Sequence, residues 1–586
     1  MKKRRLLFLL VLFTVFLSTI SLHAQINKNI WFDGISRSYF ARDAVNKSTI
    51  DDTLSTRNTS NGYNLLDLNT HVNPIKDIEI FAQLRIRNSF GSFFGSGTEI
   101  NVRQLKAKGV INNKVRFSVG DLFLKQSRFT LHNYDEELSG YENDMLKPYR
   151  DIIHYENFYT ENRWRLHGIQ TDFSFKFDRL IRRLDFDFFA TRPHGSMQIN
   201  ETTYSSDLLL SGGSMVSEIN KRLTLSGNYI NFFEVASSGT KNISVRNPVH
   251  DISILHHFGN DKYIFEQKIQ TGFSRRYWLH SELDNGIADS ISNDTEGMYF
   301  EFDNKYSKKD STLSLIVGYR YVDPNFRSAG AQTRRLDYAA GNNNTIYPIY
   351  TNMSLIRPTS VFDLVSDDRL YNQDISKTLM SFNPIYSNVL PYGDATPNRT
   401  GVYFKARIKN KKKVFIGKMN TGFFKEVIGQ GTAEKRNFGL IKGSFKVNLH
   451  RSLNWKKELS LSASSESEIT SRGGDAVSSL NLFSHQMNTS VNVELAKNFF
   501  IQTSYKQFSA NGNEFLTQRD NFGNITYFTS TQVKLKDHML SFGMLYKFRE
   551  NVYTNLQYNW WGMTFADQHY LDYKYNRIIL ILSVEL

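Results

Sequence analysis

Residues 78–89 read IEIFAQLRIRNS, and this stretch alternates apolar and polar side chains with a period of two. One series consists of Ile78, Ile80, Ala82, Leu84 and Ile86, and the other of Glu79, Phe81, Gln83, Arg85 and Arg87. Because successive side chains of a β-strand point to opposite faces, the pattern predicts a strand with one apolar and one mostly polar face. Such a strand suits a wall between lipid and water.

The next segment repeats this alternation and then turns sharply at Asn112–Lys114 into a further strand. Short turns of this kind mark the periplasmic side of outer-membrane barrels. Further short turns are expected near Pro74, at 178–182, 220–222, 259–262, 308–311, 410–413, 451–458, 496–498 and 549–551. If both termini are periplasmic, these turns predict about 22 strands, within a range of roughly 18–24.

The composition agrees with a membrane barrel. The chain has 586 residues, no cysteine and 14% aromatic residues, and its mean hydropathy is −0.42. A soluble chain of this length would usually divide into domains with separate cores, but no such division is visible. We therefore expect an all-β fold, a single large transmembrane antiparallel up-and-down β-barrel with one long, partly helical loop. The net charge of +15 suits anionic solutes or lipid head groups, and without a binding motif no nucleic-acid partner is expected.

The first residues have the order of a secretory signal peptide. Four basic residues precede an apolar run from Leu6 to Leu17, and small or polar residues follow around Ala24. The run is shorter than the ~20 residues of a spanning helix. We expect a signal peptide at 1–24, an exported chain, and a mature barrel at 25–586.

The last strand alternates to the final residue, with Ile578, Leu580, Leu582, Val584 and Leu586 on one side. In this the sequence resembles Gram-negative outer-membrane β-barrel proteins, most closely plugless porin-like and export-type barrels, although many of these end in Phe. The resemblance implies an outer-membrane location, contact with outer-membrane lipids and lipopolysaccharide, and recognition by the barrel assembly machinery. An early first strand at Ile30, Phe32 and Tyr39 leaves no room for the plug domain of a TonB-dependent receptor.

One connection, from Pro324 to Thr400, breaks the strand pattern and contains six of the ten prolines. Its aromatic content predicts a folded lobe, either extracellular or folded into the lumen. Ser360 is expected to cap a helix at Val361–Val365, with a second helical turn around Ile375, Leu379 and Met380. The candidate constriction or docking residues are Arg334, Arg335, Arg357, Asp363, Tyr371, Tyr386 and Arg399. The loop from Gln126 to Asn162 is a smaller version of the same kind.

Charged side chains on the inward series carry the functional prediction. The pore-lining basic candidates are Arg85, Arg87, Lys106, Lys108, Arg116, Lys405, Arg407 and Lys409. A basic wall favours anions in a pore. Alternatively, these cations pair with the inward carboxylates Glu79, Asp172, Asp185, Asp187, Glu301 and Asp303 and stiffen the wall. Both interpretations remain open.

Enzyme motifs are missing from the sequence. It contains no GxSxG, HExxH or Walker loop, and GSFFGSG at 91–97 lacks the lysine of a phosphate cradle. We expect no enzyme, no cofactor and no metal site. The leading hypothesis is a porin-like channel for small polar, anionic solutes, narrowed by the long lobe. The alternative is a non-enzymatic barrel scaffold or export-machine subunit that docks a surface lipoprotein.

Overall fold

The computed structural model describes residues 29–46, 58–90, 97–134, 144–158, 161–178, 180–195, 197–198, 204–205, 207–235, 241–284, 287–336, 371–376, 378–475, 478–519, 525–566 and 572–586. The expected signal peptide, the helix at Val361–Val365, and the candidates Arg357 and Asp363 lie outside these residues.

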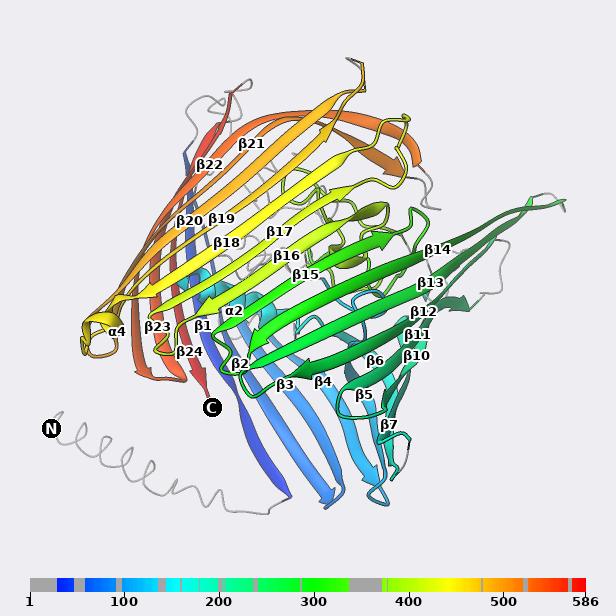
Figure 1. The fold of residues 1–586 in the computed structure, drawn as a ribbon. Helices are drawn as coiled ribbons and strands as arrows, with labels where there is room; N and C mark the ends of the chain where they lie inside the picture. The colour runs from blue at the N-terminus through cyan, green and yellow to red at the C-terminus, as the bar shows by residue number, and fades with distance from the viewer. Residues whose placement is uncertain are drawn as a thin grey trace.

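The described chain forms one closed antiparallel β-barrel (Figure 1). Its 22 strands are β1 (Ile30–Asn46), β2 (Asn58–Ile75), β3 (Ile78–Ser89), β4 (Thr98–Ile111), β5 (Val115–Leu124), β6 (Trp164–Lys176), β7 (Arg183–His194), β10 (Asp207–Glu218), β11 (Leu223–Val235), β12 (Lys241–Gly259), β13 (Tyr263–Asp284), β14 (Ile287–Lys308), β15 (Leu313–Val322), β16 (Arg399–Lys409), β17 (Phe415–Lys425), β18 (Asn437–Asn448), β19 (Leu459–Arg472), β20 (Leu480–Ala496), β21 (Phe499–Arg519), β22 (Ile525–Arg549), β23 (Val552–Phe565) and β24 (Tyr573–Glu585). The first strand pairs with the last, which closes the wall. The predicted fold class and strand number are confirmed.

Every predicted short turn joins two consecutive barrel strands. The turn at Asn112–Lys114 has two neighbouring residues, Asn112 and Asn113, at φ values of 51° and 54°. Asparagine tolerates this left-handed backbone better than most other side chains, which suits a short hairpin turn. One turn, between β18 and β19, holds the short helix α4 (Leu449–Leu453). A separate two-stranded hairpin, β8 (Met197–Gln198) with β9 (Tyr204–Ser205), lies outside the barrel sheet.

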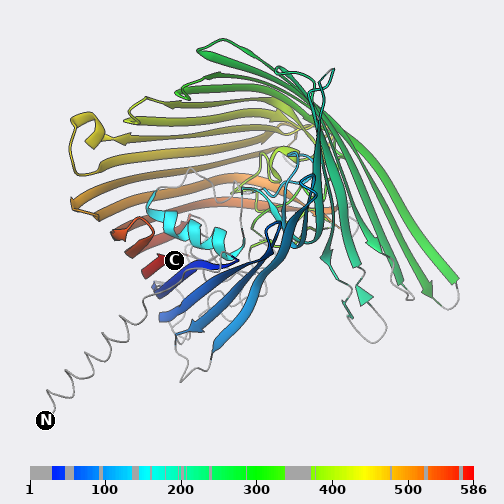
Figure 2. The ribbon, with the colours of Figure 1, turned by 90° about the horizontal axis from the view of Figure 1, so that it is seen from below.

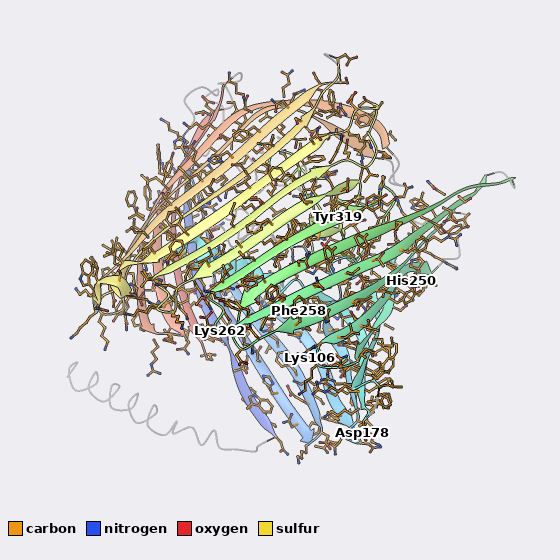
Figure 3. All side chains as sticks on the ribbon, viewed as in Figure 1. Lys106, Asp178, His250, Phe258, Lys262 and Tyr319 are labelled. Atoms are coloured by element: carbon orange, nitrogen blue, oxygen red, sulfur yellow. The ribbon has the colours of Figure 1, made fainter. Side chains whose placement is uncertain are left out.

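The predicted alternation of faces is also confirmed. Large apolar side chains such as Val102, Phe258 and Tyr319 are exposed, and Figure 3 labels Phe258 and Tyr319 on strands of the wall. Side chains of the other parity, such as Arg85, are buried in the interior. An apolar outer surface on a closed barrel suits lipid, so the chain is an outer-membrane β-barrel protein. No helix among the described residues is long and apolar enough to cross a membrane.

Two connections fold into the barrel. The first inner loop, residues 125–163, contains the 3-10 turn η2 (Asp144–Leu146) and the helix α2 (Lys147–Glu156), and Figure 2 shows α2 inside the ring of strands. The second inner loop, residues 323–398, joins β15 to β16 and contains the 3-10 turn η6 (Gly393–Ala395). The long loop was predicted to be either extracellular or folded into the lumen, and its described part lies in the lumen.

The predicted helical turn around Ile375, Leu379 and Met380 is wrong, because the described residues there are not helical. Side chains of this segment cap nearby backbone amides instead, as Ser376 does for Thr378, and such bonds compete with helix formation. Among the described residues of the inner loops the longest helix is α2, where proline in the first turn fits a helix start.

The apolar core lies between the inner loops and the inner wall. One cluster joins Tyr149 of α2 and Tyr371 of the second inner loop to wall residues such as Trp561. Another joins Phe129 and Phe326, one from each inner loop, to Tyr299 of β14. A Cβ atom on Gly297 would lie 2.2 Å from the backbone nitrogen of Phe326, so this close approach needs glycine.

Candidate functional site in the barrel lumen

An ion-pair cluster joins the two inner loops to each other and to the wall. Arg128 of the first inner loop pairs with Asp394 of the second and donates to Glu301 of β14 at 2.5 Å. Arg320 of β15 contacts the same two carboxylates, at 2.7 Å for Asp394 and 2.6 Å for Glu301. Burial raises the pKa of Asp394, but the guanidiniums of Arg320 and Arg128 outweigh it and hold this pKa well below the usual range.

A second cluster holds the C-terminal end of α2 against β1–β4. Arg85 grips Asp67 with two hydrogen bonds of 2.8 and 2.7 Å and also pairs with Glu156 at the end of α2. Arg103 donates to the backbone carbonyls of Tyr155 and Glu156, at 3.2 and 2.9 Å. Cations at a helix C-terminus stabilise its exposed carbonyls, so the wall arginines fix this end of α2.

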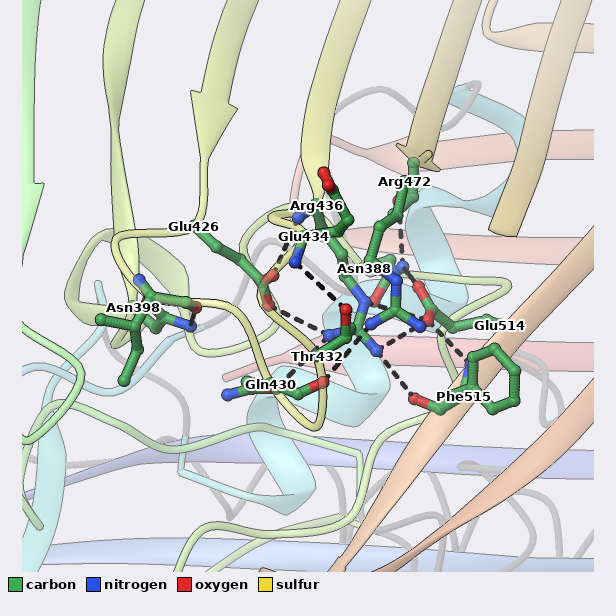
Figure 4. Close-up of polar contacts among 12 residues, drawn as sticks. Asn388, Asn398, Glu426, Gln430, Thr432, Glu434, Arg436, Arg472, Glu514 and Phe515 are labelled. Carbon is green, nitrogen blue, oxygen red and sulfur yellow. Dashed lines mark hydrogen bonds and ion pairs between the residues drawn. The ribbon is translucent and has the colours of Figure 1, made fainter. Parts of the chain in front are cut away.

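A third cluster anchors the second inner loop to β18–β21 (Figure 4). The backbone N–H of Asn388 donates to Glu468 at 2.7 Å, and the amide side chain of Asn388 donates to Glu514 at 2.7 Å. Glu514 also pairs with Arg436 at 3.0 Å. Arg399 donates to the carbonyl of Asn388 at 3.2 Å. Removal of one charged side chain from such a buried network leaves its partner unpaired and destabilises the fold.

The fourth anchor uses an aspartate that accepts hydrogen bonds from neutral groups. Asp251 of β12 is buried and accepts hydrogen bonds from Ser127 of the first inner loop at 2.9 Å, from Asn228 at 2.8 Å and from Gln270 at 2.5 Å. Tyr299 donates to it as well. With the other three clusters, it ties the described inner loops to strands on several sides of the wall, so these loops narrow the lumen at this level.

Near the short turns, the lumen widens into a chamber of about 840 Å³ between β3, β4, β5, β6, β7 and β10. Charged side chains line it in pairs: Lys108 with Glu79 at 3.0 Å, Arg116 with Asp172 at 2.5 Å, and Arg183 with Asp185 at 2.7 Å. Since the short turns are the periplasmic ends of the strands, this chamber lies on the periplasmic side of the inner loops.

The structure separates the predicted basic wall into two groups. Arg85, Lys108 and Arg116 are ion-paired as above, whereas Arg87 lies over the ring of Tyr63 and Lys106 over that of Phe81. On β16, Lys405 lies over the ring of Tyr403 and interacts electrostatically with Asp394. Lys405, Arg407 and Lys409 form no ion pair among the described residues. Arg407 lies directly opposite Lys418 of β17. Within the described barrel, the ion-paired cations and the cations without an ion pair therefore occupy different parts of the wall.

The predicted constriction residues that the structure describes lie within packed structure. Arg334 and Arg335 are fully buried in the second inner loop, where Arg334 donates to the carbonyl of Pro391 at 2.6 Å and Arg335 lies over Tyr371. The ring of Tyr386 lies 5.0 Å from that of Phe508 on the wall. Arg399 is the first residue of β16 and anchors the loop. The described candidates thus build and hold the inner loops.

Sequence reasoning missed the residues that carry the anchors, above all Arg128, Glu156, Asp394, Arg436 and Glu514. Four of them, all except Glu514, lie in or next to loops, where no alternation assigns a side chain to a face. Their partners are distant in sequence, so no spacing rule connects them. The one available signal was the inward parity of Arg85 and Glu301, which marked them as lumenal without showing that a loop would reach them.

No protein-family model matches this sequence, and no curated protein matches it. Among solved structures, Pseudomonas aeruginosa OpdQ has 10% identity over 96% of this chain and 100% of its own, with a TM-score of 0.34. Acinetobacter baumannii OccAB4 has 9% identity, the same coverages and a TM-score of 0.29. The P pilus usher (PapC) translocation pore has 7% identity over 94% and 100%, with a TM-score of 0.27. At such scores these likenesses transfer no activity to this chain.

Proposed function

We propose that this protein is an outer-membrane channel for small polar solutes, in which the two inner loops form a movable constriction. The observation that carries the proposal is the polar anchoring of these loops. Clusters around Arg128, Arg85 and Asn388 hold the loops by ion pairs and hydrogen bonds. Polar contacts can be exchanged for contacts with water or solute, which a purely apolar core cannot do. A periplasmic chamber beneath the loops supplies the space into which a solute passes.

We further propose that the channel prefers anions, because of the uncompensated cations on β16 and β17. Arg407 and Lys418 lie directly opposite each other, and like charges in this position destabilise a sheet. A solute or counter-ion with negative charge relieves that repulsion. The paired charges of the chamber contribute little net potential, so we assign the preference to Lys405, Arg407, Lys409 and Lys418.

The alternative function, a scaffold without transport, is favoured by the completeness of the anchoring. Buried ion pairs are strongly destabilised when one partner is lost, so a barrel that never opens would also retain them. In that case the inner loops stiffen the barrel and its outer end serves a surface lipoprotein or an envelope assembly. The two functions differ in whether the loops leave the lumen.

Deletion of the second inner loop distinguishes the two functions. Replacement of Arg327–Asn398 by a short Gly/Ser linker removes one side of the Arg128–Asp394 pair while the wall strands keep their backbone hydrogen bonds. A channel predicts higher single-channel conductance in planar bilayers and sensitivity of cells to bulky antibiotics. A scaffold predicts loss of a partner that co-purifies in mild detergent, and its natural form shows no conductance steps. Heat-modifiable mobility on gels verifies that the deleted barrel has assembled.

A further inference from the structure

The wall of the barrel is not uniformly closed. Strands β4 and β5 pair over six positions, from Ile111 with Val115 to Lys106 with Gly120. Every other seam of the described barrel has nine or more paired positions. Beyond Lys106, β4 pairs with β3 alone, and beyond Gly120, β5 pairs with β6 alone. The two strands therefore part on the side away from their short turn, in the extracellular half of the wall.

Two local features of the backbone, one on each strand, accompany this split. Gly120, at the point of parting, has a φ of +103°, and a Cβ atom there would lie 2.3 Å from the carbonyl oxygen of Leu105. On the other side, the β3–β4 register shifts next to Arg103, where Gln83–Gln104 gives way to Leu84–Val102. A glycine in positive φ and a bulge both bend strands and end pairing.

Side chains, not backbone, close the split. The backbone N–H of Leu105 donates to the carboxylate of Asp121 at 2.7 Å, and Arg165 of β6 donates to the same carboxylate at 2.8 Å. Arg165 also donates to the carbonyl of Arg103, which bridges β6 to β4 past β5. The ring of Phe158, from the first inner loop, contacts both guanidiniums. Its centroid lies 4.2 Å from the guanidinium carbon of Arg103 and 3.9 Å from the guanidinium carbon of Arg165.

The outer border of the split faces lipid. Ile100, Val102 and Leu105 on β4 are among the most exposed apolar side chains of the described barrel, at 64%, 64% and 55%. Unpaired strand edges at membrane depth are tolerated only where protein or a polar cavity satisfies them. A basic side chain, Arg163, donates to the carbonyl of Phe123 beside the split and also lines the periplasmic chamber. The split thus has an apolar outer border, a neighbouring chamber, and two arginines at its edges, of which Arg103 pairs with Asp67 at 2.9 Å and Arg165 with Asp121 at 2.8 Å.

We propose that the split between β4 and β5 is a lateral portal, with Phe158 as its stopper, for a lipid with an anionic head group. The acyl chains lie against Ile100 and Val102, while Arg103 and Arg165 exchange their bonds to Asp67 and Asp121 for the phosphate or carboxylate of the head group. Movement of one ring and two arginines opens the portal without breaking a strand pair. This route lies in the wall, and it shares with the axial path the first inner loop, which supplies Phe158 and whose helix α2 is held by Arg103.

Photo-crosslinking tests the portal. The aromatic photoreactive residue p-benzoylphenylalanine is placed at Phe158, at Phe423 on the exposed outer face of β17, and at the fully buried Phe129. Each variant is reconstituted in vesicles containing radiolabelled phosphatidylglycerol or radiolabelled phosphatidylcholine. We expect position 423 to capture both lipids, position 129 to capture neither, and position 158 to capture phosphatidylglycerol in preference to phosphatidylcholine. Heat-modifiable mobility verifies assembly of each variant.

A positioning variant tests the head-group site. Arg165→Gln should lower capture of phosphatidylglycerol at position 158 roughly tenfold, the loss expected when one charge-assisted hydrogen bond is removed, while capture at position 423 stays the same. Absence of lipid adducts at 158, with labelling at 423 intact, overturns the portal. Equal capture of the two lipids at 158 overturns the anionic head-group preference. The readout is lipid crosslinking and not conductance, so a negative result would overturn the portal without deciding whether the lumen conducts solutes.

Discussion

Arg128 and Asp394 form an ion pair although 266 positions separate them in the chain. The pair joins the two inner loops, and both residues also contact wall strands through Glu301 and Arg320. A single guanidinium thus links both inner loops and the barrel. The first prediction follows from this shared position.

Arg128→Gln should loosen the constriction. Loss of one partner in a fully buried ion pair costs about 3–5 kcal/mol, and the cost should be smaller here because the pair is half-buried and Asp394 keeps Arg320 as a partner. We expect the variant to assemble and to show larger or more frequent conductance steps in planar bilayers. Arg275→Gln is the matched control, because Arg275 pairs with Asp294 at 2.5 Å at an exposed site. Equal conductance of both variants and the natural chain would contradict the role of Arg128.

Charge reversal on β16 should change ion selectivity. We expect Lys405→Glu, Arg407→Glu and Lys409→Glu together to move the reversal potential in a salt gradient toward cation preference, because inward charges set the potential of a pore. The control carries Arg451→Glu, Lys456→Glu and Lys457→Glu in the exposed turn around α4. A reversal potential that moves as much in the control as in the β16 variant counts against the assignment.

Acid should release the inner loops, because two of their histidines are held neutral. Burial lowers the pKa of His132 to about 4, with Lys125, Arg128 and Arg335 acting in the same direction and Asp394 opposing them. Burial and nearby Arg150 and Arg335 lower the pKa of His154 to about 4 as well, against Asp151. Below its unfolded pKa of 6.5, each histidine binds protons more readily in released loops, so packing is lost as pH falls from 6.5 toward 4.

The size of this effect is about 3 kcal/mol for each histidine at the acid end of the window. We expect conductance to rise between pH 7 and pH 4.5 in planar bilayers. The carboxylates of Glu156 and Asp394 have pKa values below their ordinary ones and stay ionised over most of this range. The double variant His132→Gln, His154→Gln should flatten the profile, and an unaltered profile in that variant would exclude these two groups.

The seam between the first and last strands should depend on one buried ion pair. Arg577 of β24 grips Asp43 of β1 with hydrogen bonds of 2.5 and 2.7 Å, and both side chains are buried. Arg577→Met leaves the Asp43 carboxylate unpaired and should cost about 3–5 kcal/mol, which lowers the temperature at which the barrel unfolds on detergent gels. Adding Asp43→Leu should recover part of that loss. A double variant no more stable than Arg577→Met would argue against the pairing.

Cysteine labelling tests the orientation without interference, because the chain has no cysteine. Lys114→Cys, in the short turn after β4, should be protected from a membrane-impermeant maleimide in intact cells. Gly473→Cys, at the opposite end of β19, should react, and a Cβ atom there meets nothing within 4 Å. Labelling of position 114 in intact cells would show that the barrel has the opposite orientation in the membrane.

The wall was predictable from sequence because its physics is local. Alternation at residues 78–89 assigned Arg85 to the interior, and turn residues such as Asn112 and Asn113 fixed the ends of strands. The content of the lumen was not predictable in this way. Whether Arg85 faces water or Glu156 depends on a loop more than 60 positions away, and the split at Gly120 depends on pairing across two strands. Contacts between residues so distant in the chain produce no periodic pattern in the sequence.

Closure of the barrel has a consequence for the order of assembly. β1 meets β24 over twelve positions, so residue 43 finds residue 577 only after the entire chain has been synthesised and exported. Both inner loops are synthesised well before β24, and α2 packs against Tyr39 and Tyr575 on both sides of that last seam. We therefore expect the curled sheet to close around inner loops that are already in place. Substitutions that misfold the inner loops should therefore slow insertion of the barrel into the outer membrane, before they change its permeability.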